Sequence, residues 1–132
     1  MSNSVLYAGS NATITTEATG TIIPFDSIVR RYGKNIGISG GNVVVVGSGY
    51  YVGIINITYE GSASGTIEFS VLKDGVPVPF ATATATTADG VINAVAIPFR
   101  IRETCCRESV ITVVASGAVV DVTNSAVSIE KD

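Results

Sequence analysis

Side chains branched at Cβ dominate this sequence and restrict the folds that are open to it. Valine, isoleucine and threonine fill 48 of the 132 positions, whereas leucine occurs only twice and methionine once. Branching at Cβ limits the χ1 rotamers available in a helix and suits the pleated surface of a sheet. No segment shows a sustained 3.6-residue hydrophobic period. The sequence therefore predicts an all-β protein with almost no helix.

Apolar and polar residues alternate along short segments that are separated by turn residues. In residues 66–72, Ile67, Phe69 and Val71 share one face, and the Asp74-Gly75 pair that follows is typical of a tight hairpin turn. Strands are predicted at residues 21–29, 43–46, 50–59, 66–72, 77–87, 91–101, 109–115 and 119–129. Short strands at this spacing indicate an antiparallel sandwich or barrel.

The chain is long enough for one domain and too short for two ordinary ones. Residues 1–20 are small and polar, and they are predicted to form an N-terminal arm or a short strand. The main domain is expected over residues 21–132. Pro24 places the first predicted strand at an edge or a bulge. The basic segment 30–34 is expected to form a turn.

Residue types that carry chemistry are scarce. The sequence has no histidine, which removes the commonest general base and the commonest metal ligand. The 11 acidic residues are scattered singly, without a paired-carboxylate or calcium-loop spacing. We therefore expect no enzyme, no metal and no cofactor. The net charge of −3 gives no reason to expect nucleic acid as a partner. No apolar run reaches the length of a membrane span, and no signal peptide is predicted.

Cys105 and Cys106 are adjacent between Arg102 and Arg107, and they form a candidate thiol site. Two neighbouring thiols are a poor chelate, and a disulfide between neighbours needs an unusual peptide geometry. Two interpretations stay open. The favoured one is a pair of reduced thiols with one packed inward, and the other is a bridge between subunits around an assembly axis.

The predicted strand at residues 50–59 is apolar on both faces. Alternate residues of a sandwich strand face the core, and the others need only face water. A second apolar face therefore predicts contact with another subunit. The candidate interface residues are Tyr50, Tyr51, Val52, Ile54, Ile55, Ile92, Ala94 and Ala96. The sequence does not decide which parity of the central strand faces the neighbour.

Three sequence blocks occur in an order that resembles the C1q/TNF-like jelly-roll superfamily. They are Ile23-Pro24-Phe25-Asp26-Ser27-Ile28-Val29, Gly49-Tyr50-Tyr51-Val52 and Val71-Leu72-Lys73-Asp74-Gly75-Val76-Pro77-Val78. The resemblance covers about residues 21–130 and implies a two-sheet jelly roll that assembles as a homotrimer. The superfamily usually has a Gly-Asp pair before one of its last strands. This pair is missing here, and residues 102–107 occupy that region. The ligand surfaces of the superfamily are therefore not assigned to this chain.

The chain is still more similar to small structural proteins of bacteria and their phages or prophages. The resemblance rests on Tyr32-Gly33-Lys34-Asn35-Ile36, a Gly-Gly-Asn-Val turn, an Asn-Ile-Thr-Tyr strand, a Lys-Asp-Gly-Val hairpin and the cysteine pair. It implies a head-fibre or capsid-decoration protein at the virion surface, made in the host cytoplasm, whose partners are its own copies and a capsid or other virion protein. The main alternative is a bacterial cell-surface or spore-coat domain that binds a receptor or a glycan. A carbohydrate-active enzyme on a jelly roll is a third, weaker alternative.

Overall fold

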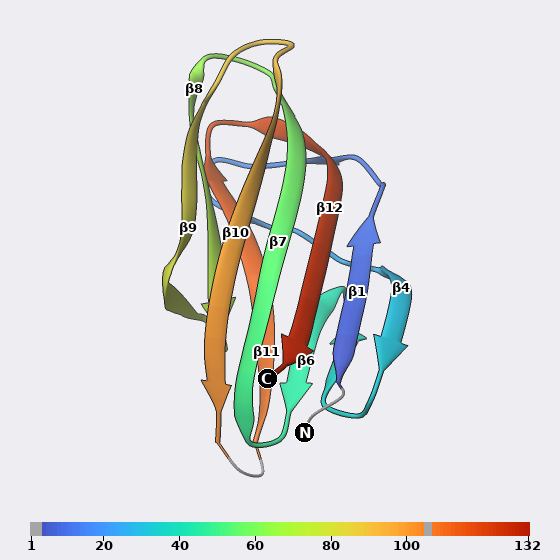
Figure 1. Ribbon diagram of the computed structural model, residues 1–132. Coiled ribbons are helices and arrows are strands. Elements are labelled where there is room, and N and C mark those ends of the chain that lie inside the picture. The colour runs from blue at the N-terminus through green and yellow to red at the C-terminus, as the bar shows by residue number, and fades with distance from the viewer. Residues whose placement is uncertain (1–3, 105–106) are drawn as a thin grey trace.

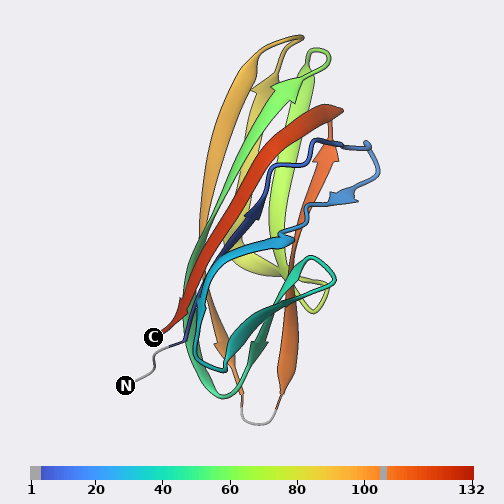
Figure 2. The same cartoon turned by 90° about the vertical axis from the view of Figure 1, so that its right-hand side faces the viewer.

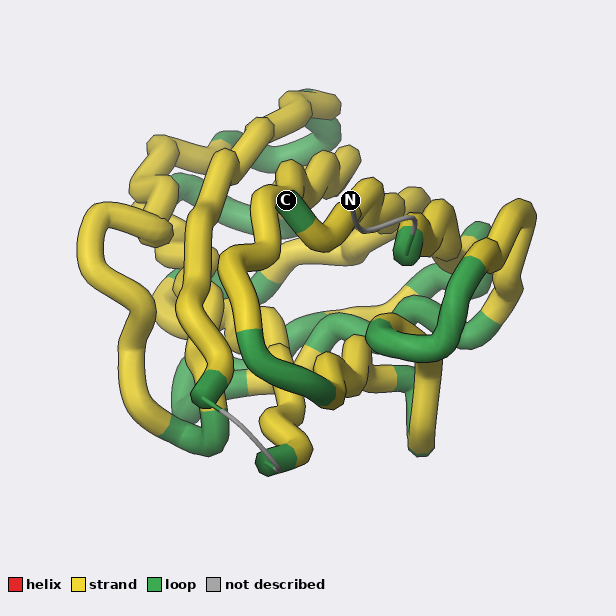
Figure 3. Tube along the Cα trace, turned by 60° about the horizontal axis from the view of Figure 1, so that its bottom comes forward, coloured by secondary structure: helices red, strands yellow, loops and turns green. Residues whose placement is uncertain are grey.

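Two antiparallel sheets pack face to face in the computed structural model, which describes residues 4–104 and 107–132 (Figure 1, Figure 2). The strands are β1 (Val5–Ser10), β2 (Ile14–Thr15), β3 (Thr21–Ile22), β4 (Ser27–Tyr32), β5 (Ile36–Ser39), β6 (Asn42–Val46), β7 (Gly49–Gly61), β8 (Gly65–Lys73), β9 (Val76–Thr87), β10 (Ile92–Glu103), β11 (Glu108–Gly117) and β12 (Val120–Lys131). Within these ranges there is no helix, and hence none that could span a membrane (Figure 3). The predicted all-β, two-sheet antiparallel jelly roll is confirmed.

The two sheets divide the strands in an interleaved order. The first sheet runs β10-β7-β12-β1-β4, with β2 beside β12. The second sheet runs β5-β6-β11-β8-β9, with β3 beside β11. Strands β9 and β10 are therefore the edges of different sheets, and they lie next to each other along one side of the sandwich (Figure 1).

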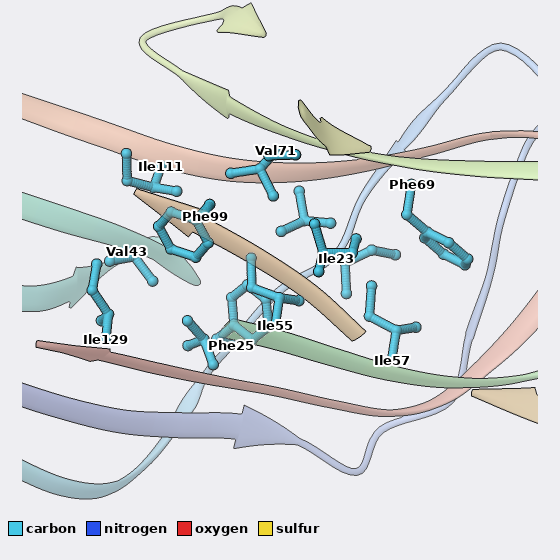
Figure 4. Close-up of a cluster of buried hydrophobic side chains, with 14 of the residues drawn as sticks. Ile23, Phe25, Val43, Ile55, Ile57, Phe69, Val71, Phe99, Ile111 and Ile129 are labelled. Atoms are coloured by element: carbon cyan, nitrogen blue, oxygen red, sulfur yellow. The ribbon is translucent and has the colours of Figure 1, made fainter. Parts of the chain in front are cut away.

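The core lies between the sheets and consists almost entirely of β-branched and aromatic side chains. Ile55 and Phe99 from the first sheet meet Val71 and Ile111 from the second (Figure 4). The rings of Tyr59 and Phe69 contribute a tilted pair with centroids 5.4 Å apart. These side chains occupy alternate positions of their strands, which is the period-2 pattern that predicted the strands.

The single strand predicted at residues 21–29 is wrong. The chain forms β3 in the second sheet, crosses at Pro24, and forms β4 in the first sheet. The Phe25 amide donates to the carbonyl of Gly41 at 2.7 Å, and Ser125 Oγ donates to the carbonyl of Pro24 at 3.0 Å. Phe25 is buried in the core. The crossing segment therefore fills the interior between the sheets.

The N-terminal residues belong to the sandwich. Strand β1 lies inside the first sheet and pairs with β12 on one side and β4 on the other. Leu6 and Ala8 reach the core, and a Cβ at Gly9 would collide with the backbone oxygen of Ser125. Of the two alternatives for residues 1–20, residues 5–10 form the strand. The expected turn at residues 30–34 is also wrong in part, because residues 30–32 extend β4.

The Asp74-Gly75 turn connects β8 to β9 with positive φ angles of 51° and 81°. These angles match the tight hairpin turn that the sequence predicted. A Cβ at Gly75 would meet no atom within 4 Å, so backbone strain is the sole cost of a side chain there. We expect Gly75→Val to lower the free energy of unfolding by about 1 kcal/mol or more in urea titrations. Gly75→Asn should cost less, because asparagine tolerates this region. Equal midpoints for wild type and Gly75→Val would contradict the turn.

Asp74 attaches this turn to β11. Its Oδ1 accepts a hydrogen bond from the Val110 amide at 2.9 Å, and its own amide donates to the Val110 carbonyl at 2.9 Å. The bond from the Val110 amide to the carboxylate holds the pKa of Asp74 below its ordinary value of 3.8. The charges of Lys73 and Arg107 act in the same direction, and partial desolvation opposes them.

A lowered folded-state pKa makes Asp74 a pH-dependent contributor to stability. The unfolded chain takes up the proton first, so the contribution is present above pH 3.8 and is lost as the pH falls through the lower folded pKa. We expect Asp74→Asn to lower the free energy of unfolding by about 1 kcal/mol or less at pH 7, since the group is exposed. The difference from wild type should shrink at pH 2. A difference that is equal at both pH values would contradict the charged hydrogen bond.

Candidate assembly surface

The outer face of the first sheet presents rows of side chains that cross all five strands. One row contains Pro98, Ile54, Ser128, Tyr7 and Arg30, and the next contains Arg100, Val52, Glu130, Val5 and Tyr32. A third row is built of small residues: Ala96, Asn56, Ala126, Gly9 and Ser27. We call the apolar part of these rows, together with Tyr50, the assembly surface: Val5, Tyr7, Tyr32, Tyr50, Val52, Ile54, Ala96 and Ala126.

Large apolar side chains on this surface are left in contact with solvent in a single chain. Tyr7, Tyr32 and Tyr50 are 46%, 56% and 50% exposed, and Ile54 is 38% exposed. The Arg102 guanidinium lies 5.8 Å from the centroid of the Tyr50 ring at the border of the surface. Tyrosine and aliphatic side chains around a row of small residues form a face of the kind that protein interfaces use.

The outer face of the second sheet has a different composition. Threonine, serine and glutamate pair across β8 and β9, in the pairs Thr66–Thr86, Glu68–Thr84 and Ser70–Thr82. Ser70 Oγ donates to Glu68 Oε1 at 3.2 Å, so these groups already bond to one another at the surface. The β8–β9 part of this outer face is therefore polar, whereas its β6–β11 part presents Val44, Val110 and Val114.

Two of the predicted interface residues are wrong, because Tyr51 and Ile55 belong to the core. Both are at most 1% exposed in one chain. The hydroxyl of Tyr51 lies 2.9 Å from the carbonyl oxygens of both Val46 and Gly47. Burial raises the pKa of Tyr51, and the charge of Glu103 adds to this effect. Their parity along β7 points them toward the second sheet.

The other predicted residues lie on the outer face. Tyr50, Val52 and Ile54 project from β7, and Ile92, Ala94 and Ala96 are exposed along β10. Ile92 and Ala94 are opposite Glu60 and Thr58, so this end of the face is mixed in polarity. The apolar character is concentrated where β7 begins. Cys105 and Cys106 lie outside the described residues.

Two tyrosines of the assembly surface, Tyr7 and Tyr32, are not among the interface residues predicted from the sequence. Tyr7 falls in the segment predicted as an arm or a short strand and Tyr32 in a predicted turn, whereas β1 and β4 place them on the same face as Ile54. The alternation Val5-Leu6-Tyr7-Ala8 carries a usable signal, since Leu6 and Ala8 share the core-facing parity. In the parts of the chain that the structure describes, no cluster of three or more histidine, cysteine, aspartate or glutamate side chains could hold a metal ion.

Comparison with solved structures finds the same fold in murine APRIL and in Eiger TNF from S. frugiperda. Murine APRIL at pH 8.5 superposes with a TM-score of 0.70 at 14% identity, covering 96% of this chain and 98% of that one. Murine APRIL at pH 5.0 gives a TM-score of 0.67 at 14% identity, with 95% and 97% covered. Eiger TNF from S. frugiperda gives 0.66 at 10% identity, with 98% and 90% covered. No protein-family model and no curated protein matches the sequence. At these identities the likeness establishes the C1q/TNF-like jelly-roll fold.

Proposed function

We propose that this chain is a non-catalytic structural module that assembles as a homotrimer through the outer face of its first sheet. The observation that carries the proposal is the unequal composition of the two outer faces. Tyr7, Tyr32, Tyr50 and Ile54 are exposed on the first sheet, whereas threonine, serine and glutamate line the outer face of β8 and β9 in the second. The resemblance to the C1q/TNF-like superfamily supports threefold symmetry. A closed ring hides one such face on every copy and leaves the polar faces outside.

Apolar burial would provide most of the stability of such an assembly. Burial of apolar surface contributes about 25 cal/mol per Å², and obligate interfaces bury more than about 2,000 Å² in total. The surface spans five strands, and its few charged groups, such as Arg30 and Glu130, stand among apolar and small neighbours. The small residues of the third row permit close approach of backbones, as a threefold axis requires.

We further propose that the trimer is a head-fibre or capsid-decoration component at a phage virion surface. The similarity to small phage and prophage structural proteins supports this role, and so does the scarcity of catalytic residue types. The polar outer face of β8 and β9 suits a module that stands in solvent. A bacterial cell-surface or spore-coat domain is the competing role.

Quantitative mass spectrometry of purified particles tests the virion role. Particles released from the producing strain should contain a fixed number of copies of the protein, counted against the known number of major capsid subunits. The number of copies per particle should be a multiple of three. Immunogold labelling should place it on the particle exterior. Recovery of the protein only on bacterial or spore surfaces would contradict the virion role, and would leave the trimer to be judged separately.

A further inference from the structure

A basic groove lies where the edge strands β9 and β10 come together, outside the assembly surface. Its lining comes from the end of β8, the start of β9, the end of β10 and Arg107, and its volume is about 470 Å³. We call it the cationic groove, and define it by Lys73, Arg100, Arg102 and Arg107 with the apolar segment 76–79. It is formed within one chain and borders the assembly surface, since Arg100 is opposite Val52 and Arg102 lies over the ring of Tyr50.

The groove concentrates positive charge in a chain that is negative overall. Four of the eight lysine and arginine residues line it, although the net charge of the chain is −3. Asp74 is the acidic residue in the lining, and its carboxylate is engaged by the Val110 amide. This local excess of cations over acidic groups in the lining favours an anionic ligand.

Within the described residues no buried ion pair holds the three arginines, although the Arg102 guanidinium lies over the Tyr50 ring. Arg100 pairs with Asp132 at 3.1 Å, but both side chains are more than 60% exposed, and such pairs are weak. Among the residues that the structure describes, Arg102 and Arg107 have no carboxylate within 4.0 Å. Lys73 differs, because its Nζ donates to the Arg102 carbonyl at 2.7 Å and lies 3.9 Å from buried Glu103. Lys73 therefore supports the β10 backbone, and the arginines face the ligand.

The strand that borders the groove is unsuited to an extended peptide. Pro77 and Pro79 have no amide hydrogen, and they occupy alternate positions of edge strand β9. A peptide that adds to a sheet edge depends on such donors. The ligand is then recognised by side chains, with guanidinium groups at anionic substituents and valine and proline against an apolar surface. An acidic saccharide combines these features.

Phe80 is an exposed aromatic residue next in sequence to the groove lining. It follows Pro79 directly, it is 102% exposed, and its φ of 61° lies in the left-handed region. Bulky residues seldom adopt this conformation, and strained residues gather at functional sites. Its ring presents an apolar face to solvent, and the ring faces of sugars are apolar. Because the side chain is fully exposed, packing in the core does not explain its strained backbone conformation.

We propose that the cationic groove binds an acidic saccharide, whose carboxylate, sulfate or phosphate substituents accept hydrogen bonds from Arg100, Arg102 and Arg107. Arginine forks match such groups in a bidentate manner. Phe80 and the segment 76–79 contact the sugar rings. This binding function is additional to the structural role proposed above.

Isothermal titration calorimetry of the full chain tests the proposal, with oligogalacturonate, dextran sulfate oligosaccharides and a phosphorylated oligosaccharide as separate probes. At least one acidic probe should bind, and neutral dextran should not. Binding should weaken as salt rises. The double change R102A/R107A should lower affinity about tenfold or more, and Phe80→Ala should lower it about threefold.

A matched double variant removes two cations elsewhere. K34A/K131A changes the net charge equally and should keep the wild-type affinity. Every variant should retain the wild-type circular dichroism spectrum and molar mass, so a loss of binding cannot come from unfolding or dissociation. Failure of all acidic probes, equal losses in the two double variants, or tighter binding of a polyglutamate peptide or an oligonucleotide would overturn the proposal. None of these outcomes bears on the trimer.

Discussion

Replacing Ile54 by aspartate is expected to convert the trimer into monomers at micromolar concentration while the sandwich stays folded. Ile54 is 38% exposed in one chain and lies at the middle of the assembly surface, between Pro98 and Ser128. Each trimer would bury three new carboxylates near one axis. Burial of an unpaired charge costs several kcal/mol per site, in addition to about 1.5–3 kcal/mol of lost apolar burial. Light scattering coupled to size exclusion measures the change.

The matched control for this variant lies on the other outer face. Thr84→Asp introduces the same charge at an exposed position of the second sheet, opposite Glu68. It should leave the molar mass unchanged. If both variants stayed trimeric, or if both dissociated, the first sheet would not be the interface.

Replacing Tyr51 by aspartate is expected to unfold the protein, although Tyr51 is only three positions from Ile54. Tyr51 is 0% exposed, and an aspartate there would lie near the buried carboxylate of Glu103. An uncompensated buried charge costs about 3–5 kcal/mol, and the loss of the ring adds about as much again. The sum is comparable with the whole stability of a small domain, about 5–15 kcal/mol. Circular dichroism and a urea titration measure the effect.

A conservative change at the same site separates packing from charge. Tyr51→Phe keeps the ring and removes the hydroxyl that lies 2.9 Å from the carbonyls of Val46 and Gly47. It should cost about 1 kcal/mol and leave a folded trimer. A folded, monomeric Tyr51→Asp variant would contradict the burial of this side chain in the core. Tyr51→Asp and Ile54→Asp together test which side chains of β7 face the core and which face outward.

The strands that alternate clearly were predictable from the sequence. Residues 66–72 carry Ile67, Phe69 and Val71 at every second position, and the structure buries these three side chains. The crossing at Pro24 was not predictable, because branched residues stand on both sides of it and either side alone suits a strand. What separates β3 from β4 is tertiary, namely the bond from the Phe25 amide to the Gly41 carbonyl.

The candidate site was predictable only in part. The apolar residues on both parities of β7 indicated an interface, but composition could not say which parity faces outward. Packing against the second sheet determines the parity, because Tyr51 and Ile55 lie in one core cluster with the side chains of that sheet. The exposure of Phe80 had no sequence signal, since it depends on the irregular pairing of β9 with β8 near Leu72.

Molar mass in solution tests the central claim most directly. Light scattering coupled to size exclusion, over a dilution series through the micromolar range, should give a single species of three times the 13.5 kDa chain mass. The mass should persist on dilution, because an obligate interface dissociates slowly. A monodisperse 13.5 kDa monomer at every concentration would contradict the account, and the apolar outer face of the first sheet would then need another partner.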